Sequence, residues 1–161
     1  MGNPNSGKSS LFNCLTGLRQ QVGNFPGVTV DKKTGVAALS NDLTANFIDL
    51  PGTYSLAARS PDEMLAVDLV LGRIPNESRP DVLLCLADAT NMERNLYLVS
   101  QAKEMGIPIV VAVTMMDLAK HQGIKIDYNK LQKAFNIPFV GINTLKGIGL
   151  SELKSALIDS S

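Results

Sequence analysis

Residues 107–114 read Ile-Pro-Ile-Val-Val-Ala-Val-Thr, a run that is apolar at almost every position and carries no charge. A strand with one face in water alternates apolar and polar residues, so this run indicates a parallel strand covered on both faces. It is also much shorter than the ~20 residues of a membrane-spanning helix. The run therefore predicts a layered α/β domain built around a buried sheet.

Other apolar runs alternate with segments of helical periodicity. The expected strands are residues 34–39, 44–50, 81–87, 107–114 and 137–142. The expected helices are residues 8–16, 62–72, 92–105, 128–135 and 149–158. The polar turn at residues 40–42 predicts an antiparallel hairpin, and the later strands predict parallel βαβ units. We expect a mostly parallel mixed sheet with one antiparallel edge and helices on both faces.

Composition limits what this chain can do. Its 161 residues fit one domain, and 15 basic against 15 acidic residues give a net charge of zero, which argues against a nucleic-acid partner. Cys14 and Cys85 are too far apart for a zinc or disulfide pattern, and His121 is the single histidine, so nothing predicts an iron site. No basic-then-apolar signal opens the chain, and we expect a soluble cytosolic domain.

The strongest motif is Gly-Asn-Pro-Asn-Ser-Gly-Lys-Ser at residues 2–9, directly before a predicted helix. This spacing fits a phosphate-binding loop, in which backbone amides and the helix N-terminus surround phosphate oxygens. Lys8 would bridge the β- and γ-phosphates, and the Ser9 hydroxyl would ligate Mg²⁺. The alternative is a glycine-rich turn that only caps a helix. The residues expected at the nucleotide are Asn3, Asn5, Ser6, Gly7, Lys8, Ser9 and Ser10.

Two later elements fit phosphate chemistry. Asp49 ends a predicted strand and could hold Mg²⁺, and the Gly52 amide could approach the γ-phosphate. Between them and the loop, the polar stretch 20–33 carries Thr29, whose hydroxyl could complete the metal shell. A surface loop that merely contains a threonine remains the alternative.

These motifs, with Val22 to Val30, Pro51 to Leu56 and Asp88 to Leu96, make the chain resemble the cytosolic G domain of the bacterial ferrous iron transport protein B family. The resemblance covers essentially the whole chain. It implies a Ras-like fold of the phosphate-loop NTPase class, binding of GTP and GDP, and GTP hydrolysis with Mg²⁺. It also implies a membrane domain as partner, at the cytoplasmic side of the bacterial inner membrane, and a small helical domain after this segment; both lie outside residues 1–161.

The resemblance further implies that Asn5 helps to coordinate an activating K⁺ beside the phosphates; the alternative is that Asn5 only tolerates a tight turn. Catalytic roles then fall to Lys8, Asn5, Thr29 and Gly52. Thr53 stands where related GTPases often carry a glutamine that orients water, so we expect slow turnover.

Base recognition departs from the usual pattern. Where relatives carry Asn-x-x-Asp, this chain has Thr114, Met115, Met116 and Asp117. Asp117 keeps the carboxylate that accepts guanine N–H groups. Thr114 lacks the asparagine amide, so we expect a weaker link to the base and the phosphate loop and an affinity lower by roughly tenfold, about 1.4 kcal/mol. A second base loop is expected at residues 142–147, with Asn143 and Thr144.

Only Met1 precedes the phosphate loop, although a strand leads into such a loop and occupies the middle of the sheet. Three explanations stay open: native residues precede Met1, which we favour; another segment fills the gap; or the loop is displaced. The leading function is a GTPase switch domain of an iron transporter. A nucleotide-binding or structural module with impaired turnover, and a GTPase of tRNA modification or ribosome assembly, are the alternatives. The oligomeric state stays open.

Overall fold

The computed structural model describes residues 1–3, 5–17, 20–53, 55–56 and 60–161. The helices are α1 (Lys8–Thr16), α2 (Pro61–Val70), α3 (Met92–Glu104), α4 (Met116–His121), α5 (Tyr128–Phe135) and α6 (Leu150–Ser160), with a short 3₁₀ turn η1 (Ala89–Asn91) before α3. The strands are β1 (Gln20–Asn24), β2 (Asp31–Ala38), β3 (Thr44–Asp49), β4 (Leu83–Asp88), β5 (Ile109–Thr114) and β6 (Phe139–Gly141).

The described strands form two three-stranded sheets, one parallel and one antiparallel, which we call the parallel half and the antiparallel half. The parallel half has the order β4-β5-β6. Leu83 to Asp88 pair in parallel with Ile109 to Thr114, and β6 pairs with the other edge of β5. Every residue of β5 is buried, as expected for a strand covered on both faces. The prediction of a parallel core strand from the apolar run is therefore confirmed.

The antiparallel half has the order β1-β2-β3. The hairpin of β2 and β3 agrees with the prediction, but β1 does not, because the sequence predicts a polar loop for residues 20–33. Gln20 to Asn24 pair antiparallel with β2, from Gln20 opposite Gly35 to Asn24 opposite Asp31. No residue of β1 is buried, so the backbone ladder holds the strand without the apolar alternation that reveals strands in a sequence.

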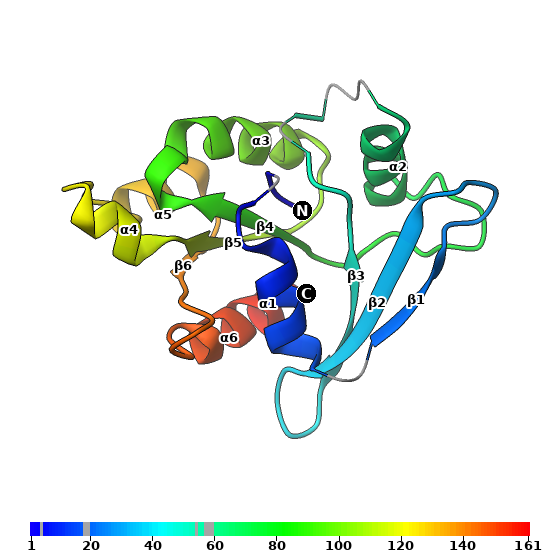
Figure 1. The fold of residues 1–161 in the computed structure, drawn as a ribbon, viewed down its shortest axis with the longest axis horizontal. Helices are drawn as coiled ribbons and strands as arrows, with labels where there is room; N and C mark the ends of the chain where they lie inside the picture. The colour runs from blue at the N-terminus through cyan, green and yellow to red at the C-terminus, as the bar shows by residue number, and fades with distance from the viewer. Residues whose placement is uncertain (4, 18–19, 54, 57–59) are drawn as a thin grey trace.

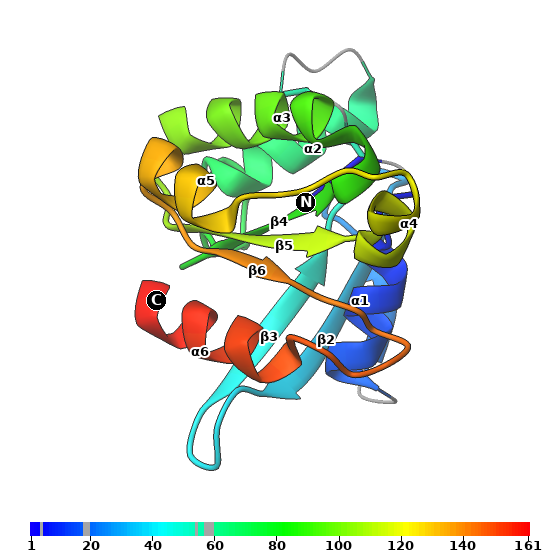
Figure 2. The ribbon, with the colours of Figure 1, turned by 90° about the vertical axis from the view of Figure 1, so that its left-hand side faces the viewer.

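Helices cover both faces of the parallel half (Figures 1 and 2). On one face, α1 and α6 contribute Leu11, Leu153 and Leu157 to a buried cluster with Leu86 and Val110. On the other face, α2 and α3 bury side chains in a larger cluster, against which residues of α5 pack. The predicted α/β class is confirmed. The short helix α4 was not predicted, because its six residues are too few to show a clear period.

Helix α1 lies very close to the antiparallel half. A Cβ atom built on Gly35 of β2 would stand 2.5 Å from Cγ2 of Thr16, the last residue of α1. Glycine therefore permits this close approach of helix and strand. The contact fixes the helix that begins at the glycine-rich loop against the β2-β3 hairpin.

Met1 and Gly2 stand where the two halves of the sheet meet. The Leu86 amide donates to the Met1 carbonyl at 2.8 Å, and the Met1 amino group donates to the Leu84 carbonyl at 2.7 Å. On the other side, the Thr53 amide donates to the Gly2 carbonyl at 3.0 Å. Within the described residues no other segment pairs with this edge of β4. The loop after Gly2 therefore starts beside the edge of β4.

Candidate functional site

The glycine-rich loop turns from the edge of β4 into α1. Asn5 and Gly7 have φ angles of 65° and 87°, which place both in the left-handed region. Gly7 is the N-cap residue of α1, and no side chain caps this end of the helix. The first-turn amides of α1 are therefore not satisfied by a capping side chain, and this is the arrangement in which helix N-termini bind anions.

A cavity of about 480 Å³ opens beside this loop. Its lining residues are Asn3, Asn5, Gly7, Lys8, Ser9, Ser10, Gly52 and Met115. All eight are residues that the sequence predicted to bind nucleotide or to act on it. The structure thus brings residues from the loop, from the segment after β3 and from the end of β5 to one place.

Lys8 and Asp49 form an ion pair at this site. Their side chains are only 17% and 11% exposed, so the pair is partly withdrawn from water. The two residues were predicted to act on the same ligand, Lys8 on phosphates and Asp49 on Mg²⁺. In this conformation each neutralises the other.

Thr114 and Ser6 join the underside of the loop to the end of β5. The Thr114 hydroxyl, which is buried, donates to the Ser6 carbonyl at 2.7 Å. This hydrogen bond joins the segment after β5 directly to the glycine-rich loop, and whether the link is weaker than an asparagine would make it stays a prediction. Ser6 Oγ and Asn3 Oδ1 are also buried, and neither has a hydrogen-bond partner among the described residues.

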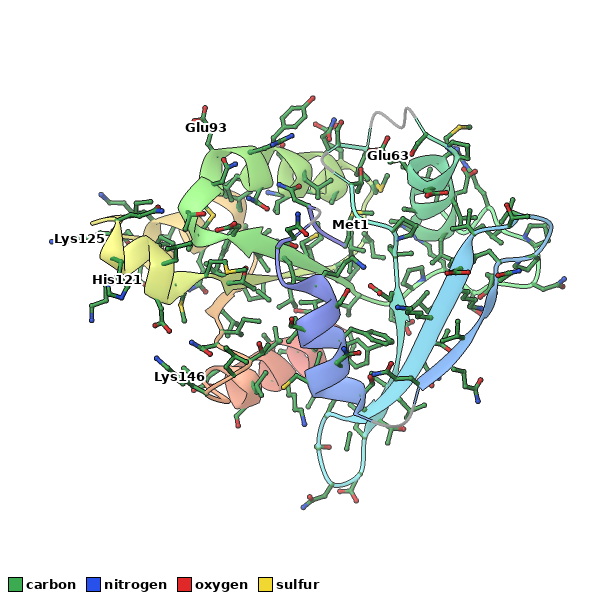
Figure 3. All side chains as sticks on the ribbon, in the orientation of Figure 1. Met1, Glu63, Glu93, His121, Lys125 and Lys146 are labelled. Atoms are coloured by element: carbon green, nitrogen blue, oxygen red, sulfur yellow. The ribbon has the colours of Figure 1, made fainter. Side chains whose placement is uncertain are left out.

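A second group of polar side chains follows β5 and β6. Asp117 accepts hydrogen bonds from the Asn143 amide at 2.9 Å and from the Lys146 ammonium at 3.0 Å. Hydrogen bonding to Lys146, followed by its charge, lowers the pKa of Asp117. Thr144 is half-buried in the same loop. Figure 3 labels Lys146 in this loop before α6.

Sequence reasoning assigned Asn143 and Thr144 to this loop but gave Lys146 no role. The feature of the sequence that could have pointed to Lys146 is its position as a cation inside the polar turn that follows β6. Which way such a side chain points depends on the turn itself, and spacing along the chain does not reveal it. Met115, at φ 57°, is 40% exposed and lines the cavity rather than the core.

Of the predicted metal-shell residues, Ser9 lines the cavity, Asp49 does not line it but pairs with Lys8, and Thr29 is brought to neither. Thr29 is exposed, in the turn between β1 and β2, and it is not among the cavity-lining residues.

Phe25, which is 1% exposed, anchors this turn in the core. Lys32 pairs with Glu77 beyond α2 and lies 5.7 Å from the Phe25 ring centroid. These contacts anchor the turn to the core and to the segment after α2.

Thr53 is buried, and its side chain contacts residues of the segment between β3 and α2 and of α2 itself. Its Oγ1 lies 2.6 Å from the Ser55 carbonyl and 3.2 Å from Glu63 Oε1. Glu63 also forms a capping box with Ser60 at the start of α2. The hydroxyl of Thr53 is therefore directed into this local network.

Two searches of the described residues gave negative results. No group of three or more histidine, cysteine, aspartate or glutamate side chains is arranged to hold a metal ion in that part of the chain. None of its helices is both long and apolar enough to cross a membrane.

An uncapped helix N-terminus after a glycine-rich loop, a lysine in the adjoining cavity and a carboxylate at the end of β3 define a phosphate-loop nucleotide-binding domain of the α/β class. Comparison with known proteins narrows this class. A sequence model of the family "Ferrous iron transport protein B" matches residues 1–157.

Two curated relatives show the extent of the match. The chain is 44% identical over 165 residues to the Fe(2+) transporter FeoB of Legionella pneumophila (strain Paris), covering 100% of this chain and 21% of that protein. The transporter of the same name from Salmonella typhimurium is 44% identical over 161 residues, covering 98% of this chain and 20% of the relative. The chain thus spans about a fifth of the length of these relatives.

Solved structures agree. The cytosolic domain of T. maritima FeoB in its GMPPNP form has a TM-score of 0.90 and 46% identity, covering 98% of this chain and 60% of that one. The G domain of the same transporter has a TM-score of 0.87 and 44% identity, covering 99% of this chain and 94% of that one. This chain belongs to the ferrous iron transport protein B family and matches its G domain.

Proposed function

We propose that this domain binds GTP and GDP together with Mg²⁺ and hydrolyses GTP slowly. The observation that carries the proposal is the cavity in which Lys8, Ser9 and the uncapped N-terminus of α1 meet. The related structures in GMPPNP-bound and GDP-bound forms support it, since their chains are alike in sequence and fold.

The residues of the cavity fit a magnesium nucleotide. Mg²⁺ prefers oxygen ligands; Ser9 lines the cavity, and the Asp49 carboxylate is paired with Lys8, which also lines it. Asp49 is held by Lys8 in the present conformation. Binding would separate the pair, with Lys8 moving to the phosphates and Asp49 facing the metal. Asn5 lines the same cavity, so its side-chain oxygen is available for K⁺.

Guanine selectivity would come from Asp117. Its carboxylate accepts N–H donors, and guanine offers two such groups on one edge where adenine presents a different pattern. Lys146 and Asn143 already donate to this carboxylate, which keeps it ionised and oriented. Asn143 and Thr144 would then lie beside the base, with Met115 covering its face.

Hydrolysis would depend on backbone groups near Gly52 and on Thr29 after its turn moves, because the Thr53 hydroxyl is engaged elsewhere. That engagement also favours the second candidate function, a nucleotide-binding module with impaired turnover. Phosphate release from GTP with Mg²⁺, compared in K⁺ and Na⁺, separates the two. Release that is faster in K⁺ supports the switch, whereas no release above the uncatalysed rate supports the binding module.

A change in base specificity tests the role of Asp117. Calorimetry should show GDP binding and no comparable binding of ADP. Asp117→Asn should lower GDP affinity at least tenfold and favour xanthosine diphosphate, whose base offers an acceptor where guanine has an amino group. Asp127→Asn, a change of the same kind at the N-cap of α5, serves as the matched control. Equal binding of GDP and ADP by the unchanged chain would exclude the assignment.

In a longer protein we propose that the domain works at the cytoplasmic side of a bacterial inner membrane, joined to a membrane domain that moves ferrous iron. The support is that the relatives carrying this name are about five times longer than the chain. Protease treatment of oriented vesicles containing the longer protein checks the placement, since this segment should be cleaved from the cytoplasmic face alone.

A further inference from the structure

A turn of sequence Phe-Pro-Gly-Val lies between β1 and β2 and begins at Phe25. The Val28 amide donates to the Phe25 carbonyl at 3.3 Å, and Gly27 has a φ angle of 76°. Proline at the second position and a left-handed glycine at the third are typical of a type II turn. The Phe25 amide also donates to the Val30 carbonyl at 3.1 Å. Thr29 therefore belongs to a compact unit whose first side chain is buried in the core.

A second turn of the same kind, Ile-Pro-Asn-Glu, follows α2. The Glu77 amide donates to the Ile74 carbonyl at 3.2 Å, and Asn76 takes the left-handed position with a φ angle of 62°. Ile74 is buried in the core, as Phe25 is in the first turn. Figure 1 shows the end of the β1-β2 hairpin beside α2 and the segment that follows it. The second turn thus fixes the position of Glu77 beside the first.

Lys32 of β2 joins the two turns. Successive residues of a strand face opposite sides, and Gly35, three positions later, meets Thr16 of α1, so Lys32 points away from α1. Its ammonium pairs with Glu77 and lies 5.7 Å from the Phe25 ring centroid, within the range of a cation–π contact. The Lys32 and Glu77 side chains are only 22% and 14% exposed, so water and salt screen this pair less than a pair at the surface.

These contacts belong to one arrangement of the turn. Thr29 is not among the residues that line the phosphate cavity in this arrangement. To complete the metal shell of a bound nucleotide, the turn has to move, and its movement as a unit would take the Phe25 ring away from Lys32. An interaction that is present in one of two arrangements shifts the equilibrium towards that arrangement.

We propose that Lys32 is a positioning residue of the proposed GTP site, which keeps the turn that carries Thr29 in its present place through Glu77 and the Phe25 ring. The inference rests on the proposed function, in which the third phosphate and its metal draw Thr29 to the cavity. GDP lacks that phosphate and binds without moving the turn. Lys32 therefore opposes the triphosphate selectively and sets how strongly the domain distinguishes GTP from GDP.

The first measurement needs no nucleotide. Lys32→Met keeps the apolar stem of the side chain and removes its charge. Hydrogen exchange at the Phe25 and Val28 amides, which close the turn, should become about three- to tenfold faster. Lys33→Met is the matched control, because Lys33 is exposed on the opposite side of β2, and it should leave both rates unchanged. Equal acceleration in the two variants, or none in Lys32→Met, would overturn the proposal.

The second measurement compares GDP with the GTP analogue GMPPNP by calorimetry in Mg²⁺. In Lys32→Met and in Glu77→Gln, the affinity for GMPPNP should rise about three- to tenfold, whereas the affinity for GDP should stay unchanged. The double variant should change the ratio no more than Lys32→Met alone, because both substitutions remove the same interaction. Lys32→Arg keeps a cation that can pair with Glu77 and should restore the original ratio.

The ratio of the two affinities separates positioning from a merely structural role. A structural role would weaken the binding of both nucleotides together, and an unchanged ratio in Lys32→Met would overturn the proposal. If the unchanged chain bound neither nucleotide, the proposed GTP-binding function would fail instead. Amide exchange at Phe25 and Val28 would then still decide whether Lys32 holds the turn.

Discussion

The Thr114 hydroxyl donates a 2.7 Å hydrogen bond to the carbonyl of Ser6, 108 residues earlier in the chain. The bond is buried and ties the end of β5 to the underside of the glycine-rich loop. The segment that we propose for base recognition and the loop that we propose for phosphate binding are thereby joined directly.

Thr114→Val removes this bond and leaves the Ser6 carbonyl without its side-chain donor. We expect the free energy of unfolding to fall by about 1–3 kcal/mol, together with a loss of GDP affinity. Urea denaturation and calorimetry measure the two effects. Thr114→Ser keeps the hydroxyl and should lose much less of both; equal losses in the two variants would show that the methyl group matters and the bond does not.

The same position tests the expected cost of replacing asparagine. Thr114→Asn should raise GDP affinity by roughly tenfold, about 1.4 kcal/mol, if the amide gains a contact that the hydroxyl cannot make. Calorimetry at one salt concentration provides the comparison. An unchanged affinity would mean that the Thr114–Ser6 bond already supplies what an asparagine would.

Asp49→Asn frees Lys8 from its ion pair. Without Mg²⁺, the unpaired ammonium should bind the phosphates of GDP about tenfold more tightly than in the unchanged chain, because binding no longer has to break the pair. With Mg²⁺, the added affinity that the metal provides should be lost. Titrations in EDTA and in Mg²⁺ check both, and Asp42→Asn in the exposed β2-β3 turn is the control. A weaker EDTA affinity in Asp49→Asn would contradict the competition between Asp49 and phosphate.

Gly35→Ala should destabilise the domain, because the new Cβ would stand 2.5 Å from Thr16 Cγ2. Forcing α1 away from β2 costs about 1–3 kcal/mol, as overpacking generally does. Gly23→Ala is matched to it: the residue lies in β1, and a Cβ there meets nothing within 4 Å. Thermal denaturation of the two variants should separate them clearly; a similar Tm for both would mean that the helix moves without strain.

The two thiols should differ in reactivity. Cys14 is exposed, whereas Cys85 is buried in β4 and its burial raises the pKa of the thiol to about 11. At pH 8 a disulfide reagent should therefore label one thiol per native chain and two per unfolded chain. Cys14→Ser should abolish the native signal. Fast labelling of that variant without denaturant would show that β4 opens readily.

The depressed pKa of Asp117 predicts a pH dependence. Lys146 lowers this pKa below the ordinary value of about 3.9. The interaction of Lys146 with ionised Asp117 therefore stabilises the folded state above that value, and this stabilisation is lost as the pH falls through the folded-state pKa. Lys146→Met should raise the pKa of Asp117 in an NMR titration of its carboxyl carbon. Lys133→Met on α5 should leave the pKa of Asp117 unchanged. A pKa shift of equal size in Lys133→Met would show that the loss of any positive charge, and not the contact with Lys146, causes the effect.

Patterns with a strong physical signal were read correctly from the sequence. The apolar run ending at Thr114 became a fully buried strand, and α1 has the predicted bounds of Lys8 and Thr16. Most residues of the glycine-rich loop line one cavity. The motif was recognisable because the backbone geometry of such a loop requires its glycines and lysine at fixed spacing. Strand β1 was missed because its residues bury nothing, and backbone pairing leaves no trace in side-chain type.

The sequence indicated several residues that line one cavity, but not the contacts that the side chains around it make. Sequence reasoning named Lys8 and Asp49 as partners of a ligand, and the structure adds that they pair with each other. The contact of Lys146 with Asp117, the inward turn of Thr53 and the outward position of Thr29 all depend on how loops fold. Such choices are set by tertiary contacts, which spacing along the chain does not encode.

The burial of Phe25 sets a minimum free energy for moving the turn that carries Thr29. Thr29 sits four residues after this ring, so if the turn travels to the cavity as a unit, the ring leaves the core and exposes a side chain whose burial is worth about 1.5–3 kcal/mol. A ligand must recover at least that much from its new contacts, which corresponds to roughly a 10- to 150-fold difference in affinity between the two arrangements. A ligand whose contacts with the turn supply less free energy than this would leave the turn in its present position. Only a ligand that supplies more would move it.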